Sequence, residues 1–170
     1  MSFTPDQESR LLELLEKDAI NNVLLRYSRG MDRCDRAMLE SSYWPDAQDD
    51  HVSYVGDAMG FIDYSLATVA QMQTQHRIAN VWIELTSPTT ARSESYFWAW
   101  HFVPSADGPA EHIVAIARFM DHYEKRGAEW RFSRRKLVLD GMFAAPYRPV
   151  EAFGELKLEG GTLGALADST

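Results

Sequence analysis

Residues 91–103 carry the sequence ARSESYFWAWHFV, which is dense in aromatic side chains. Such a run favours a β-strand, in which successive side chains point to opposite faces of a sheet. Alternation predicts two faces: Tyr96, Trp98, Trp100 and Phe102 on one, and Phe97, Ala99 and His101 on the other. Four aromatic side chains on one face exceed what one layer of helices usually covers. This face is expected either to be ordinary core or to be buried in a homo-oligomer, a dimer or a trimer.

The segments on both sides of this strand have the same character. We predict further strands at 78–85, 112–125 and 129–139. Turn-forming residues separate them, at 87–90, 104–109 and 126–128. Because three of the four strands are long and the connections are short, the strands are expected to form a strongly curved antiparallel meander.

The N-terminal part of the chain has helical periodicity. Apolar residues recur at a 3.6-residue spacing through 5–33, and Thr4 followed by Pro5 is typical of a helix start. Shorter helices are predicted at 36–43, capped by Asp35, and at 61–76, with a short strand at 51–55 between them. Helices first and strands last predict an α+β fold with the helices on one face of the sheet.

Composition bounds the classes of function. The 170 residues suit one domain, and the net charge of −8 argues against nucleic acid as a partner, because phosphates repel an acidic surface. Cys34 is the only cysteine, so no disulfide within the chain and no four-cysteine zinc site can form. No apolar run approaches a membrane span, and the first ten residues lack the order of a secretory signal, so a cytoplasmic protein is expected.

Five motifs occur in an order that resembles a known family. They are RYSRGMDRCD (26–35), YWPDAQDDHVSY (43–54), QHRIANVWIEL (75–85), ARSESYFWAW (91–100) and ARFMDHYEKRGAEWRFSRR (117–135). Together they resemble the SnoaL-like branch of the nuclear transport factor two-like superfamily, which includes scytalone dehydratase, lindane dehydrochlorinase and bile acid 7α-dehydratase. The resemblance implies a cystatin-like α+β barrel, in which a curved antiparallel sheet wraps around N-terminal helices and leaves a cone-shaped pocket. It implies a SnoaL-like domain at 1–150 and a peripheral extension at 151–170.

Asp32 and His76 lie where the lyases of this family keep their aspartate and histidine. A carboxylate near a helix C-terminus faces the negative end of the helix dipole, so another partner is expected to hold Asp32 there. A histidine oriented by a carboxylate is a complete general base. The alternatives are a solvated Asp32 paired with Arg29 or Arg33, and a His76 that serves as a cap or surface residue.

Tyr27 and Tyr54 match tyrosines that the resemblance places in the pocket. A phenol there would donate a hydrogen bond to a carbonyl or to a leaving hydroxyl group. Tyr27 also continues the apolar stripe of the first helix, and Tyr54 alternates with Val52, so packing in the core accounts for both equally well.

Basic residues near the end of the last strand are the expected anion contacts. The resemblance places a functional arginine at Arg135 or Lys136, and alternation puts Arg135 on the face opposite Arg134 and Lys136. Only one of these two faces can point into the pocket. The alternative is that the three basic residues form an outer, solvated face of the strand. Trp44 completes the set of expected substrate contacts.

The expected function is that of a cofactor-independent lyase or isomerase, dehydratase-like, acting on a hydrophobic and cyclic small molecule. Two alternatives remain: a non-catalytic small-molecule binding domain, and an accessory subunit akin to the small subunit of ring-hydroxylating dioxygenases. No metal site is expected, because no pair of histidines has the i, i+4 helical spacing of a metal site.

Overall fold

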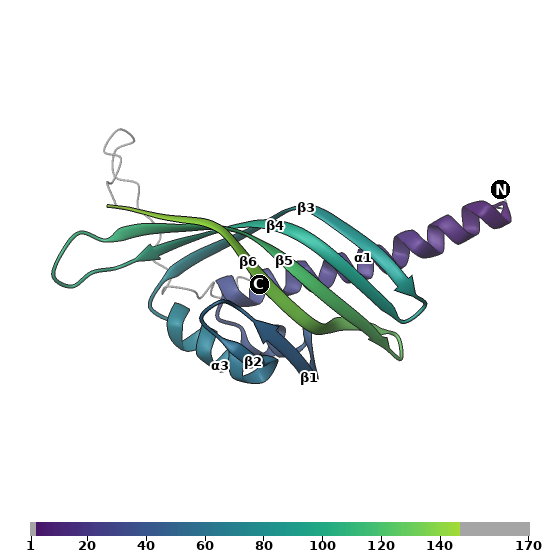
Figure 1. Cartoon of the computed structure of the whole chain (residues 1–170), viewed down its shortest axis with the longest axis horizontal. Coiled ribbons are helices and arrows are strands. Elements are labelled where there is room, and N and C mark those ends of the chain that lie inside the picture. The colour runs from purple at the N-terminus through teal and green to yellow at the C-terminus, as the bar shows by residue number, and fades with distance from the viewer. Residues whose placement is uncertain (1–2, 147–170) are drawn as a thin grey trace, which may run out of the picture.

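The computed structural model describes residues 3–146, which form an α+β fold with the N-terminal helices packed against one curved sheet (Figure 1). The extension expected at 151–170 lies outside the described residues. The elements follow in the order α1 (Pro5–Asp32), α2 (Arg36–Glu40), β1 (Tyr43–Asp50), β2 (Val55–Asp57), α3 (Ala58–Val69), β3 (Gln73–Ser87), β4 (Thr90–Val103), β5 (Glu111–Arg126) and β6 (Glu129–Pro146).

The six strands of this part of the chain make one sheet in the order β2-β1-β6-β5-β4-β3. The strands β3 to β6 pair antiparallel with their neighbours in sequence, which confirms the predicted meander. β1 pairs with β6 in parallel, and β2 pairs antiparallel with β1. Because β2 and β3 stand at opposite ends of this order, the sheet curves without closing into a complete barrel.

The C-terminal half of helix α1 packs against the sheet. Ile20, Leu24, Tyr27 and Met31 are buried at helical spacing, and α1 packs against β3 and β6. Its first turns extend past the sheet and leave Leu12 exposed (Figure 1). The expected start is confirmed, since Thr4 and Gln7 form a capping box ahead of the helix. The core therefore lies between the second half of α1 and the concave face of the sheet.

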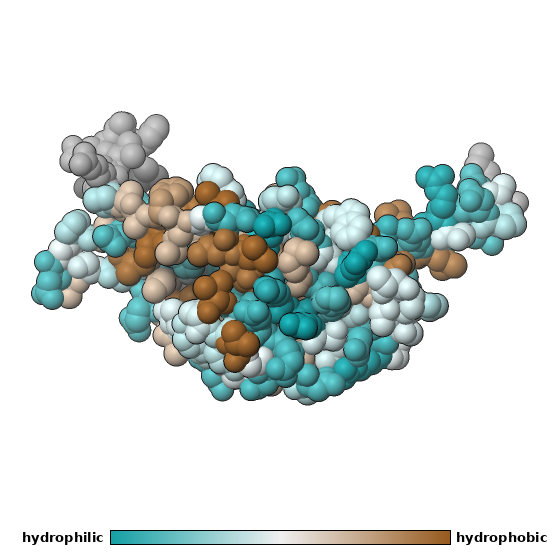
Figure 2. Space-filling view, viewed as in Figure 1, coloured by the Kyte–Doolittle hydropathy of each residue, from teal (hydrophilic) through white to brown (hydrophobic). Residues whose placement is uncertain are grey.

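The predicted alternation of β4 is confirmed by burial. Phe97 and Ala99 are buried on the concave face, whereas Tyr96 and Trp98 are exposed on the convex face. Figure 2 shows hydrophobic residues gathered over the end of the sheet away from the start of α1.

The prediction was wrong between residues 43 and 57. The structure has no strand through 51–55; β1 starts earlier, at Tyr43, and a tight connection follows it, in which Val52 adopts a positive φ of 62°. Pro45 lies in β1 where the pairing register with β6 shifts, and this irregular stretch tolerates its missing N–H. The third helix also ends at Val69 instead of residue 76, so His76 lies inside β3 and not at a junction.

Candidate active site

Asp32 and His76 are hydrogen-bonded to each other. The Nδ1 atom of His76 lies 2.7 Å from Oδ1 of Asp32, and the backbone N–H of His76 donates to both carboxylate oxygens, at 3.1 and 3.0 Å. Thr74 also donates its hydroxyl group to Oδ1, at 2.9 Å. Only 8% of the His76 side chain and 14% of the Asp32 side chain are exposed. The two side chains form a nearly enclosed carboxylate–imidazole pair.

The fold explains why a carboxylate stands at this helix end. Asp32 is the last residue of α1, where the helix dipole disfavours a negative charge. β3 is an edge strand, so the backbone N–H of His76 has no strand partner on that side and is free to bind the carboxylate. Burial opposes the ionisation of Asp32, but the hydrogen bonds from His76 and Thr74 outweigh it and lower the pKa of Asp32. The ionised form is therefore favoured.

The ring of His76 forms part of the wall of a cavity of about 370 Å³ on the concave side of the sheet. This volume is within the range of small-molecule sites, roughly 300–1,000 Å³. The wall is mainly apolar, and its larger apolar side chains are Met31, Phe61, Val69, Phe97, Leu137, Leu139 and Met142. Polar side chains, among them Ser53, Tyr64 and Thr68, come from α3 and the connection before β2. The cavity suits a hydrophobic ligand with few polar groups.

His101 lies beside His76 in the same wall. The two rings meet edge to face, with their centroids 5.8 Å apart. The Nδ1 atom of His101 is buried and has no hydrogen-bond partner within residues 3–146. Burial, and then the neighbouring His76, lower the pKa of His101. His101 is therefore a neutral imidazole beside the pair.

A second carboxylate–imidazole pair faces the cavity from another element. The Nδ1 atom of His51 lies 2.8 Å from Oδ1 of Asp49, and Oδ2 of Asp49 accepts a hydrogen bond of 2.6 Å from the Tyr43 hydroxyl group. The Asp49 side chain is fully buried, and His51, which is 18% exposed, contributes to the cavity wall. Its ring stacks on Phe61, with centroids 4.3 Å apart.

Arg135 and Tyr27, two of the predicted site residues, lie together in the core and do not contribute to the cavity wall. The guanidinium of Arg135 makes two hydrogen bonds to the carboxylate of Asp121, and both side chains are fully buried. Tyr27, Phe119 and Phe132 surround the guanidinium carbon with ring centroids at 4.1, 3.8 and 4.0 Å. Burial raises the pKa of the Tyr27 phenol. Their positions fit a buried ion pair in an aromatic cage.

None of the other predicted residues is itself among the described residues that line the cavity. Tyr54 donates its hydroxyl group to the backbone oxygen of Asp57, and Trp44 donates its indole N–H to the backbone oxygen of Glu124. Lys136 is on the convex face, 54% exposed and 3.9 Å from Asp50. The structure thus joins Asp32 to His76, and Tyr27 to Arg135, but does not bring these two groups into one site.

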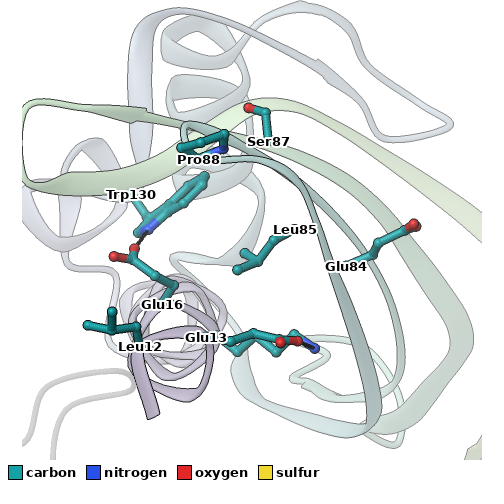
Figure 3. Close-up of a pocket in the computed structure, with 9 residues that line it drawn as sticks. Leu12, Glu13, Glu16, Glu84, Leu85, Ser87, Pro88 and Trp130 are labelled. Atoms are coloured by element: carbon teal, nitrogen blue, oxygen red, sulfur yellow. Dashed lines mark hydrogen bonds and ion pairs between the residues drawn. The ribbon is translucent and has the colours of Figure 1, made fainter. Parts of the chain in front are cut away.

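A second hollow lies at the other end of the fold, between α1 and the β3–β4 turn (Figure 3). Its volume is about 460 Å³, and its lining residues include Leu12, Glu16 and Trp130. Glu16 accepts hydrogen bonds from the indole of Trp130 and from the ammonium group of Lys125. Because both oxygens of the Glu16 carboxylate already accept hydrogen bonds, this hollow is a weaker candidate for an active site than the cavity beside His76.

Several residues of these networks were not found from the sequence: Tyr43, Asp49, His51, Thr74, His101 and Asp121. The available signal for the second pair was the run Asp-Asp-His at 49–51, in which a carboxylate stands two residues before a histidine. Two residues along a strand share a face, but the break in the strand after Asp50 is not visible in the sequence. Within residues 3–146 no cluster of three or more potential metal ligands occurs, and no helix is long and apolar enough to cross a membrane.

The comparisons with known proteins agree with this architecture. A family model described as a SnoaL-like domain matches residues 12–136. A search of curated proteins by sequence gave no match. Among solved structures, hexachlorocyclohexane dehydrochlorinase LinA-type3 from Novosphingobium barchaimii is 18% identical, with a TM-score of 0.70 over 83% of this chain and 99% of that one.

Two further solved structures extend the likeness. A scytalone dehydratase-like protein from Novosphingobium aromaticivorans is 21% identical, with a TM-score of 0.68 over 84% of this chain and 95% of that one. A protein of cystatin-like fold from Nostoc punctiforme is 16% identical, with a TM-score of 0.56 over 82% of this chain and 96% of that one. At these identities the likeness shows the fold, whereas the family model spans most of the chain. The chain belongs to the SnoaL-like domain family.

Proposed function

We propose that this chain is a cofactor-independent lyase or isomerase in which His76, oriented by Asp32, removes a proton from a carbon atom of a hydrophobic small molecule. One observation carries the proposal: the His76 ring that lines the mainly apolar cavity has its Nδ1 atom 2.7 Å from Oδ1 of Asp32. The solved structures of similar fold include a dehydrochlorinase and a scytalone dehydratase-like protein, which supports lyase chemistry in this family.

The pair has the parts of a general base. With Asp32 ionised, Nδ1 of His76 donates to the carboxylate, and the lone pair of Nε2 is left available to the cavity. The carboxylate then stabilises the imidazolium that forms when His76 takes a proton. His101, neutral and adjacent, adds no competing positive charge. The mainly apolar wall lowers the local dielectric constant, which strengthens these electrostatic contacts.

The other predicted residues have no part in this proposed step. Tyr27 and Arg135 are fully buried, and neither Tyr54 nor Lys136 contributes to the cavity wall among the described residues. In this proposal the acidic proton is activated by a group of the substrate itself, such as an adjacent carbonyl. The proposed substrate is a ring-bearing compound with a proton on the carbon next to a carbonyl group.

The test uses 4-phenylbutan-2-one, a ring-bearing ketone without a leaving group, and follows exchange of its α-protons for deuterium in D₂O by NMR. The wild type is expected to accelerate the exchange. His76→Asn is expected to reduce the acceleration by about 10²-fold or more, the usual contribution of a general base. Asp32→Asn is expected to lower it by at least about tenfold, because it removes the charge that orients His76. The control is His122→Asn, which changes an exposed histidine of β5.

Two results would contradict the proposal. If His76→Asn exchanged the protons as fast as the wild type, His76 would not be the base. If the wild type bound the ketone, as shown by chemical-shift changes, but catalysed no exchange, the chain would be a binding domain without catalytic activity.

A further inference from the structure

We propose that His51, supported by Asp49, is a second proton-transfer residue, which protonates a hydroxyl leaving group while His76 removes the carbon-bound proton. This assignment rests on the proposed function and narrows it from lyase or isomerase to dehydratase. It requires that the two histidines face one ligand from different sides, that His51 is suited to carry a proton, and that the two pairs differ.

The fold places the two histidines on different sides of the cavity. His51 follows β1, which stands near one end of the sheet order, and His76 lies in β3 at the other end. Between them the rings of Phe97 and Phe119 are stacked, 4.1 Å apart, with His76 near Phe97 and His51 near Phe119. Both histidines contribute to the wall of the same cavity. In each pair Nδ1 is held by a carboxylate, so Nε2 is the nitrogen left for a ligand.

The buried ionic group around Asp49 contains two carboxylates, those of Asp49 and Asp121, but only one guanidinium group, that of Arg135. Asp49, Arg135 and Asp121 are aligned as register partners across β1, β6 and β5, and all three side chains are buried. Asp121 takes two hydrogen bonds from Arg135, which leaves the negative charge of Asp49 without a cation bonded to it. A buried charge is costly unless it is paired. A proton on His51 brings the charge of this group to zero.

The hydrogen-bond partners of the two carboxylates also assign the acid role to His51 and the base role to His76. Asp32 shares its charge among the hydroxyl group of Thr74, the backbone N–H of His76 and the His76 ring. Asp49 has only the Tyr43 hydroxyl group besides His51 among the residues described. His51 also stacks on Phe61, and the face of an aromatic ring attracts a cation. His51 therefore suits the role of acid, and His76, beside the neutral His101, suits that of base.

The reaction balances with these two groups alone. Nε2 of His76 takes the proton from the carbon next to the carbonyl group, and the electrons of that C–H bond form a C=C bond. The C–O bond to the adjacent carbon breaks, and Nε2–H of His51 gives its proton to the departing oxygen, which leaves as water. His76 ends protonated and His51 neutral, and exchange of protons with solvent restores both. The substrate class is a ring-bearing β-hydroxy ketone, because hydroxide needs a proton to leave and weakly basic leaving groups do not.

The experiment compares three compounds with one skeleton. 4-Hydroxy-4-phenylbutan-2-one must lose water, 4-acetoxy-4-phenylbutan-2-one loses acetate without needing an acid, and 4-phenylbutan-2-one reports α-proton exchange alone. Both eliminations give the same conjugated enone, which is followed by its ultraviolet absorbance. His51→Asn is expected to slow loss of water by about 10²-fold or more. In His51→Asn the rate of water loss should therefore fall relative to the rates of acetate loss and of α-proton exchange, whereas His76→Asn should slow all three reactions.

Asp49→Asn is the companion variant, since it keeps the size of the side chain and removes its charge. As a positioning residue, Asp49 is expected to act on loss of water and to spare the other two reactions. Melting curves of each variant check that the fold persists, but the ratio of the two elimination rates is measured on one preparation and does not depend on the folded fraction.

The outcomes of this experiment test the role of His51 as acid separately from the role of His76 as base. If His51→Asn left loss of water unchanged, or slowed all three reactions equally, His51 would not be the acid. Exchange of the α-protons by the wild type without loss of water would also overturn the role of His51 and leave that of His76 standing. Absence of exchange would overturn the proposed function, and the assignment of His51 with it.

Discussion

Nε and Nη2 of Arg135 each lie 2.8 Å from an oxygen of the Asp121 carboxylate, and both side chains are completely buried. The two residues are direct register partners on β6 and β5, so the sheet itself sets their alignment. Aromatic rings enclose the guanidinium on the remaining sides. This arrangement makes the pair a structural element of the core under the cavity.

Removal of one member of this pair should destabilise the protein strongly. Arg135→Leu leaves Asp121 buried without its cation, and the free energy of unfolding is expected to fall by about 3–5 kcal/mol in urea denaturation. The matched control is Arg118→Leu, which breaks the more exposed pair with Asp140 and should lower the free energy of unfolding much less, because solvent screens an exposed ion pair. The double variant Arg135→Leu/Asp121→Leu should regain part of the loss. If Arg135→Leu and Arg118→Leu lowered the free energy of unfolding equally, the structural role of the buried pair would be contradicted.

The stability contributed by Asp32 should depend on pH. Because hydrogen bonds lower its pKa in the folded protein below the ordinary value of 3.8, Asp32 stabilises the fold above that value. The contribution is lost as the pH falls through the lower, folded pKa. Urea denaturation of the wild type and of Asp32→Asn is therefore expected to differ most at pH 5–7, with a gap that narrows below about pH 4. A gap that stays constant between pH 7 and pH 3 would show that the charge of Asp32 is not what stabilises the fold.

Filling the cavity should prevent ligand binding. Ala115 contributes to the cavity wall on β5, and Ala115→Leu adds a larger side chain to that wall. Binding of 4-phenylbutan-2-one, measured by titration calorimetry, is expected to weaken at least about tenfold. Overpacking typically costs 1–3 kcal/mol of stability, so melting curves should accompany the titration. Ala79→Leu, on the exposed side of β3, is the control and should bind the ketone normally.

The convex face of the sheet carries the predicted oligomer contact. Tyr96 and Trp98 are 45% and 52% exposed on β4, where a monomer would leave them in water. We expect the wild type to elute as a dimer or trimer in size-exclusion chromatography with light scattering, and Trp98→Lys to shift it toward monomer. Val55→Lys, which changes another exposed apolar residue, should leave the assembly intact. A wild type that is monomeric at micromolar concentrations would contradict the prediction.

Outside residues 43–57, the sequence determined the order of the helices and strands and the alternation of side chains along the strands. Alternation along 91–103 divided the side chains of β4 into two faces, because a strand places successive residues on opposite faces, and the structure showed that the face with Phe97 and Ala99 is the buried one. Helical periodicity located the buried stripe of α1 from Ile20 to Met31, and Thr4 with Pro5 marked its start. Alternation, helical periodicity and helix capping depend on residues close together in the chain, so they can be predicted from a single sequence. The region 43–57 escaped this reasoning, because β1 is stabilised by pairing with β6, about 90 residues later in the chain.

The tertiary structure alone decided which polar residues meet. The family resemblance predicted Asp32 and His76 as a pair, but the way they meet depends on the edge position of β3, which brings the N–H and the ring of His76 to the carboxylate. The same strand order set Arg135 against Asp121 and away from the cavity, and it brought His51 to the cavity wall instead. Alternation separates the two faces of a strand, but the curvature of the sheet and the helices packed on it decide which part of the inner face is core and which lines a cavity. That depends on contacts between residues far apart in the chain, which no local pattern contains.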